Sequence, residues 1–142
     1  MVASKAGVEL QPEGRPYSQL LEDLIRDPKL APFRLESISH QAPEDGGLNI
    51  EGLAAGPNGE LWIGFRSPIP DGKALFVPIL NPAEVVQGTT AKIGDARLLD
   101  LEGLGVRDMA WTGREWFIIG GRAGSGGNAK LFRWSGGTDQ PV

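Results

Sequence analysis

Cysteine is absent from the sequence, and histidine occurs once, at His40. Without cysteine the chain forms neither disulfides nor thiolate metal sites, and a single histidine nearly excludes a zinc site of the usual ligand set within one copy. Positive charge is also scarce, with 14 Lys and Arg against 18 Asp and Glu and no basic stripe. The charge balance argues against nucleic acid and anionic membranes as partners, because both select basic surfaces.

Long apolar runs and common catalytic motifs are missing as well. No run approaches the ~20 apolar residues that a membrane-spanning helix needs, and residues 1–14 lack the apolar core of a secretory signal, so we expect a cytoplasmic protein. No Gly-x-Ser-x-Gly is present. The glycine-rich segment Gly120–Lys130 lacks the Gly-Lys-Ser/Thr ending of a phosphate loop and joins two predicted strands. We expect a hairpin loop there.

Glycine and proline are abundant instead, with 21 and 11 copies among 142 residues. They alternate with apolar segments, a pattern that predicts many tight turns and not disorder. The length corresponds to about one domain, which we place at residues 18–142 after a flexible lead, residues 1–17. A short helix is predicted from Ser18, the expected N-cap, to Pro28, which ends it.

The rest of the chain predicts strands joined by turns. Pro-Asn-Gly at residues 57–59 is typical of a tight turn between two strands, and Asn81-Pro82 predicts the start of a second short helix. Counting all segments gives eight short strands: Phe33–Ser39, Ile50–Ala55, Leu61–Phe65, Ala74–Leu80, Ala96–Leu101, Gly105–Trp111, Trp116–Gly121 and Ala129–Trp134.

A repeat at an offset of 56 residues relates the strands. It pairs Ile50 with Val106 and Gly64 with Gly120, among other matches, across three successive strands. Four short antiparallel strands per 40–50 residues is typical of a β-propeller blade. We therefore predict an all-β fold of two propeller-like blades, about 48–101 and about 104–135, with a spare outer strand at about 33–39. A two-sheet sandwich of eight strands is the alternative.

Two blades do not close a ring, because known rings use roughly four to eight. Either the chain is a fragment of a longer protein or several copies complete the ring. We favour a homo-oligomer, and among oligomers a trimer of six blades, in which each spare strand completes the last blade of a neighbour.

Three segments carry a family resemblance: LIRDPKLAPF, GLNIEGLAAGPNGELWIGFRSPIPDGKALFVPILNP, and LGVRDMAWTGREWFIIGG with the later KLFRW. Together they resemble the bacterial family called domain of unknown function 3616, over roughly residues 18–135. That family is similar to phytase-like and esterase-like propeller proteins. The resemblance implies a propeller fold and no particular reaction.

Polar residues in the first strand of each predicted blade form the candidate site. Strand alternation places Asn49, Glu51 and Leu53 on one face, and Ile50, Gly52 and Ala54 on the other. The repeat partners of Glu51 and Gly52 are Arg107 and Asp108. We expect five ligand-binding residues facing a channel or its mouth: Asn49, Glu51, Arg66, Arg107 and Asp108.

Two interpretations of this set remain open. Glu51 and Asp108 are oxygen donors of the kind that Ca²⁺ prefers, so a calcium site is one of them. The other, which we favour, is a structural ion pair of Glu51 with Arg107 or Arg66 that ties neighbouring blades together.

No nucleophile and base occur in a recognisable pattern. The predicted function is therefore a binding or scaffold module without catalytic machinery of its own, acting through self-assembly or through protein or small-ligand binding. The alternative is a calcium-dependent phytase-like or esterase-like hydrolase that uses channel-facing carboxylates. Whether the chain is an enzyme stays open at this stage.

Overall fold

The computed structural model of the protein describes residues 11–12, 14–124 and 126–142, so residues 1–10 and 13 of the predicted lead lie outside it. Seven strands form two antiparallel sheets: sheet 1, in the order β1-β2-β3-β4, and sheet 2, in the order β5-β6-β7. The elements are α1 (Leu20–Arg26), η1 (Pro28–Phe33), α2 (Leu35–Ser39), η2 (Pro43–Asp45), β1 (Asn49–Ala55), β2 (Leu61–Ser67), η3 (Pro70–Gly72), β3 (Ala74–Ile79), α3 (Pro82–Val85), β4 (Arg97–Leu99), β5 (Gly105–Trp111), β6 (Trp116–Gly121) and β7 (Lys130–Trp134).

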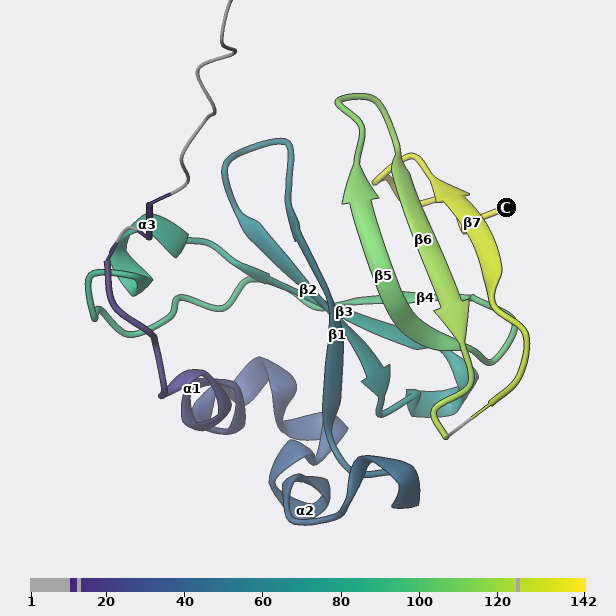
Figure 1. The fold of residues 1–142 in the computed structure, drawn as a ribbon, viewed down its shortest axis with the longest axis horizontal. Coiled ribbons are helices and arrows are strands. Elements are labelled where there is room, and N and C mark those ends of the chain that lie inside the picture. Colours follow the sequence, from purple (N-terminus) through teal and green to yellow (C-terminus); the bar gives the residue numbers. More distant parts are fainter. Residues whose placement is uncertain (1–10, 13, 125) are drawn as a thin grey trace, which may run out of the picture.

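The fold has three layers, with sheet 1 in the middle (Figure 1). One face of sheet 1 packs against the N-terminal helices, through a core that includes Leu24, Leu35, Ile63 and Val77. Its other face packs against sheet 2, through a second core that includes Phe76 with the residues Val106, Met109, Trp116, Ile118, Phe132 and Trp134. Among the described residues no helix is both long and apolar enough to cross a membrane.

Glycines of sheet 1 let the two sheets approach closely. Gly52 and Gly64 face each other across the β1–β2 ladder and form a flat patch. A Cβ atom on either one would lie 2.7 Å from Val106 Cγ1, and that of Gly52 would lie 2.9 Å from the Met109 sulfur. The two side chains of β5 therefore occupy the space that a larger residue in sheet 1 would need.

A bulge in the first strand of each sheet sets which residues face inward. The β1–β2 register shifts between Asn49 and Ile50 and again at Glu51, and the β5–β6 register shifts at Arg107. An extra residue at a bulge reverses the alternation of faces beyond it. As a result Val106 and Met109, three positions apart, both point toward sheet 1.

The bulge corrects one prediction about β1. Simple alternation put Ile50 on the same face as Gly52 and Ala54. Instead, Ile50 packs against the core under the helices, whereas Ala54 packs against the core between the sheets. The extra residue, Glu51, lies between them and accounts for the change.

The predicted spare strand at residues 33–39 is wrong. Phe33 ends the helix η1, and residues 35–39 form the helix α2. Arg34, with φ 51°, turns the chain between them, and Leu35 is buried in the core beneath the helices. The alternating pattern that predicted a strand also places Leu35 and Ile38 on one side of a single helical turn. The described chain thus has seven strands, and no strand 33–39 is available to complete the blade of a neighbour.

The single offset of 56 is also wrong for the second and third strands of each sheet. Leu61 pairs with Ala55 at the end of the first hairpin, and Trp116 pairs with Trp111 at the end of the second. Leu61 and Trp116 are 55 positions apart, because the turn at residues 56–60 has one residue more than the turn at 112–115. Sheet 1 and sheet 2 nevertheless share strand order, direction and the position of the bulge.

Candidate functional site

Glu51 lies at the bulge of β1 and is held by two donors. Asn49 Nδ2 donates to Glu51 Oε1 over 3.2 Å, and Arg66 Nη1 donates to the same oxygen over 2.6 Å. The side chains of Arg66 and Glu51 are 16% and 29% exposed. The pair is therefore partly shielded from solvent, in contrast to a fully exposed surface ion pair.

Arg66 also ties sheet 1 to the loop that follows β6. Its Nε donates to the carbonyl oxygen of Arg122 over 2.9 Å, and its Nη2 donates to that of Gly124 over 2.6 Å. The planar fork of a guanidinium suits three acceptors at fixed angles, which a lysine ammonium does not match in the same way. Of the two ion pairs predicted for Glu51, the structure forms the one with Arg66.

Arg107 lies at the bulge of β5. It lies over Gly121 of the adjacent strand, where a Cβ atom would come within 2.2 Å of Arg107 Nε. That Nε is buried and has no hydrogen-bond partner among the described residues. Gly121 therefore leaves the room that the arginine side chain needs.

Asp108 is exposed and belongs to the side of sheet 2 that faces away from sheet 1. Its Oδ1 accepts a hydrogen bond from the backbone N–H of Met109 over 2.8 Å. Its neighbours across the ladder are Ile119 and then Leu131. Asp108 thus has apolar neighbours on its face of the sheet.

The carboxylates predicted for calcium do not form a suitable donor set. Ca²⁺ takes six to eight oxygen ligands, but the carboxylate of Glu51 is bound to a guanidinium whose positive charge disfavours a cation beside it. In the described part of the chain, no group of three or more His, Asp or Glu residues is arranged to hold a metal ion. The ion pair of Glu51 therefore argues against the calcium interpretation, which stays a prediction.

The glycine-rich segment 120–130 joins β6 to the antiparallel strand β7, as predicted, although its Ser125 is outside the described residues. A shallow pocket of about 440 Å³ opens beside it. Lys130 in this pocket is paired with Glu102. Of the two cationic residues that line the pocket, Lys130 is thus paired with a carboxylate, and Arg122 is the other.

Glu60 is an ordered carboxylate that sequence reasoning missed. It is 9% exposed and ends the turn between β1 and β2. Trp62 Nε1 donates to its Oε1 over 2.8 Å, and the Asn58 N–H donates to its Oε2 over 3.0 Å. Burial raises the pKa of Glu60, but the hydrogen bonds from Trp62 and the backbone outweigh that effect and leave the pKa below its usual value. The sequence signal for this ordered carboxylate is a Glu that directly follows a Pro-Asn-Gly turn.

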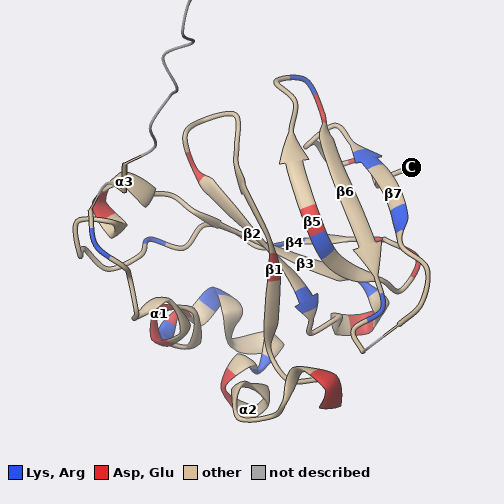
Figure 2. Ribbon diagram, in the orientation of Figure 1, with Lys and Arg blue, Asp and Glu red and all other residues tan. Residues whose placement is uncertain are grey.

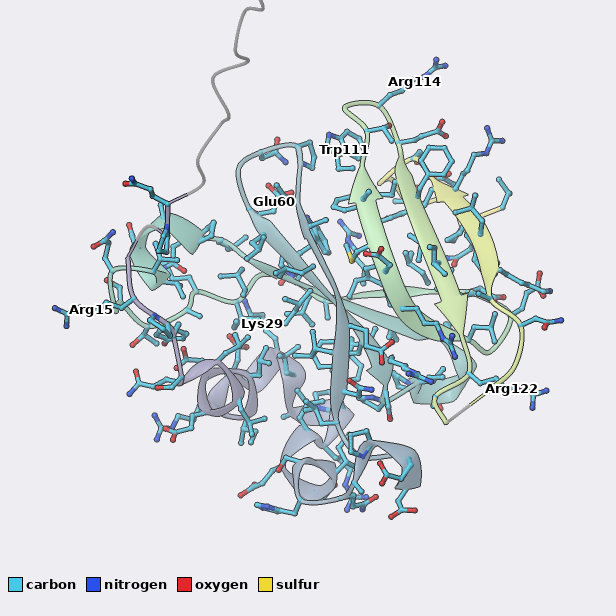
Figure 3. All side chains as sticks on the ribbon, in the orientation of Figure 1. Arg15, Lys29, Glu60, Trp111, Arg114 and Arg122 are labelled. Carbon is cyan, nitrogen blue, oxygen red and sulfur yellow. The ribbon has the colours of Figure 1, made fainter. Side chains whose placement is uncertain are left out.

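Tryptophans gather at the same end of the molecule. Trp116 packs edge-on against Trp62, with ring centroids 6.1 Å apart, and lies 5.4 Å from Trp111. Trp111 is half-buried against this core. Figure 3 shows Glu60 and Trp111 at one end and Arg122 at the other. Trp62, Trp116 and Trp134 therefore belong to the core between the two sheets.

Comparison with known families gives one match. The model of the family described as Protein of unknown function (DUF3616) matches residues 4–141. The chain belongs to this family, and the resemblance noted in the sequence is confirmed to that extent. The comparison finds no match among curated proteins or among solved structures.

Proposed function

We propose that the chain is a non-catalytic, β-propeller-type module of two stacked blades that acts by binding through the exposed face of sheet 2. The stacking of sheet 1 on sheet 2 supports the blade interpretation. Both sheets are antiparallel, both follow chain order, and both carry a bulge in the first strand. The first strands, β1 and β5, pack against each other, as the innermost strands of successive blades do.

The observation that carries the proposal is the set of hydrogen bonds made by Arg66. Its guanidinium binds Glu51 in sheet 1 and two carbonyl groups next to sheet 2. Two of the charged residues that sequence reasoning assigned to a ligand, Glu51 and Arg66, thus take part in the contact between sheet 1 and the segment after β6. Ligand binding then falls to the surface that remains open, the outer side of sheet 2.

The alternative is a calcium-dependent hydrolase that uses Glu51 and Asp108. Glu51 is paired with Arg66, and Asp108 lies on the side of sheet 2 that is turned away from sheet 1. Neither environment favours calcium, so we rank this function below the binding module.

Thermal unfolding with and without Ca²⁺ tests the choice. The protein, Glu51→Gln and Asp108→Asn are melted in calcium and in EDTA, and each is assayed for hydrolysis of phytate and of p-nitrophenyl acetate. We expect the same melting temperature in both buffers and no hydrolysis above the buffer rate. A calcium-dependent rise that either substitution abolishes would overturn the proposal, since a ligand that binds only the folded state raises its stability. Hydrolysis lost in either variant would overturn it as well.

A further inference from the structure

The outer face of sheet 2 is a small apolar surface with one charge at each of two corners. Two rows cross the sheet, because the ladder sets Asp108 beside Ile119 and Leu131, and sets Ala110 beside Phe117 and Arg133. Leu131 is 63% exposed and Ile119 is 37% exposed. Ile119 and Leu131 are thus neighbouring apolar side chains on the open face of sheet 2.

The two charges lie at opposite corners of this face. Asp108 is in the first strand and the first row, and Arg133 is in the last strand and the second row. A two-fold axis that runs across the face from Ala110 to Leu131 places Asp108 of each copy opposite Arg133 of the other. The face is therefore complementary in charge to itself, which is the condition for a symmetric contact.

The face of sheet 1 that points away from sheet 2 also favours a symmetric contact over a head-to-tail stack. A head-to-tail stack would need the opposite face of sheet 1, but the helices α1, η1 and α2 cover that face (Figure 1). The charges on the strands of sheet 2 agree with a symmetric contact: both charged residues of β7 are basic, whereas β5 carries charges of both signs (Figure 2). An antiparallel β7–β7 edge contact would bring like charges together.

We infer that the outer face of sheet 2 binds the same face of a second copy, with Asp108–Arg133 pairs at both ends of an apolar centre. This inference rests on the proposed function, because it names a second copy as the partner that the outer face of sheet 2 binds. At ~4.8 Å between strands and ~3.4 Å per residue, each copy contributes on the order of 300 Å². Stable complexes bury roughly 800 Å² per partner, so the pair forms only at high protein concentration.

Sedimentation velocity from 10 µM to 1 mM tests the pairing, at concentrations chosen for a weak complex. We expect a shift from about 15 kDa toward twice that mass, with no larger species, because a symmetric contact closes at two copies. Leu131→Asp should abolish the shift. The control is Leu53→Asp, since Leu53 is 60% exposed but lies in the edge strand of sheet 1; this variant should pair normally.

Charge exchange tests the orientation. Asp108→Arg and Arg133→Asp should each weaken pairing by about tenfold, and the double variant should restore it, because the exchange recreates both pairs. A monomer at 1 mM, growth beyond two copies, equal loss in Leu53→Asp and Leu131→Asp, or a double variant no better than the singles would each overturn the inference. A monomer leaves the non-catalytic module standing, which calcium and hydrolysis test separately.

Discussion

Sheet 1 is covered on both faces, and sheet 2 on one. Every residue of β3, in the middle layer, is buried. In β7 of the outer layer only Phe132 and Trp134 are buried, whereas Lys130, Leu131 and Arg133 are exposed. The sequences differ accordingly, with a continuous apolar segment in β3 and alternation in β7. The sequence pattern of a strand thus indicates the layer in which it lies. The exposed alternate residues of sheet 2 form its outer face.

The largest effect is expected where the two sheets meet backbone to backbone. A Cβ atom at Gly105 would lie 2.0 Å from the carbonyl oxygen of Arg66. Neither backbone moves without separating the sheets, so Gly105→Ala should cost about 3 kcal/mol, or roughly 10 °C in melting temperature.

Circular dichroism melts measure this loss, and Gly124→Ala is the control. Nothing lies within 4 Å of a Cβ atom at Gly124. If both variants melt at the same temperature, the sheets do not approach as closely as described.

A smaller loss is expected at Gly52, because side chains and not backbone fill the space above it. Gly52→Ala should cost about 1–3 kcal/mol by pushing Val106 and Met109 away. Val106→Ala in the same chain should recover at least about 1 kcal/mol of that loss, since it frees the space.

Urea unfolding of the singles and the double gives this coupling. Val77→Ala is the matched control, because Val77 is equally buried but belongs to the core under the helices. Its effect should add to that of Gly52→Ala. Simple additivity with Val106→Ala would contradict the packing of β5 on the glycine patch.

The hairpin turns of the two sheets predict different responses to pH. The Glu60 carboxylate holds the turn of sheet 1, whereas in sheet 2 the Thr112 hydroxyl does so, by accepting from the Glu115 N–H and donating to the Glu115 carbonyl oxygen. Because the folded state lowers the pKa of Glu60, its contribution is fully present above the ordinary value of 4.5 and is lost as the pH falls through the lowered pKa.

Glu60→Gln should therefore cost about 1–2 kcal/mol at pH 7, and the difference from the parent should shrink below about pH 4.5. Urea unfolding between pH 7 and pH 3 measures it. Glu115→Gln serves as control and should change stability little at any pH. A Glu60→Gln deficit that stays constant down to pH 3 would show that the carboxylate charge does not hold the turn.

Patterns of a few residues predicted much of this fold. The hairpin strands were found to within two residues at most boundaries, because apolar alternation and glycine turns are local signals. The helix α3 begins after Asn81 as predicted, and the side chain of Asn81 donates to Glu84. Local signals failed where tertiary packing decided the outcome. Residues 35–39 read equally well as a strand or as a helical turn, and burial of Leu35 against sheet 1 selects the helix.

The candidate site was predicted less well, for a geometric reason. Alternation in β1 pointed to Glu51 as a candidate, but no pattern in one strand reports the extra residue of a bulge. The choice of Arg66 over Arg107 as its partner depends on the arrangement of the strands, since Arg66 lies on the adjacent strand β2 and Arg107 lies in sheet 2. The role of Gly124 as an acceptor for Arg66 is a backbone interaction, and the sequence carries no signal for it.

The smallest effect is expected at the tie between the sheets, because its side chains are partly exposed. Arg66→Lys keeps a charge near Glu51 but loses the fork that also reaches the carbonyl groups of Arg122 and Gly124. The loss should be about 0.5–1.5 kcal/mol, with faster amide exchange on both sides of Arg122. Arg26→Lys is the control, since Arg26 pairs with Glu22 on an exposed helix surface and should cost almost nothing. If both lysine variants are equally stable and exchange alike, the two sheets are held together by their apolar core alone.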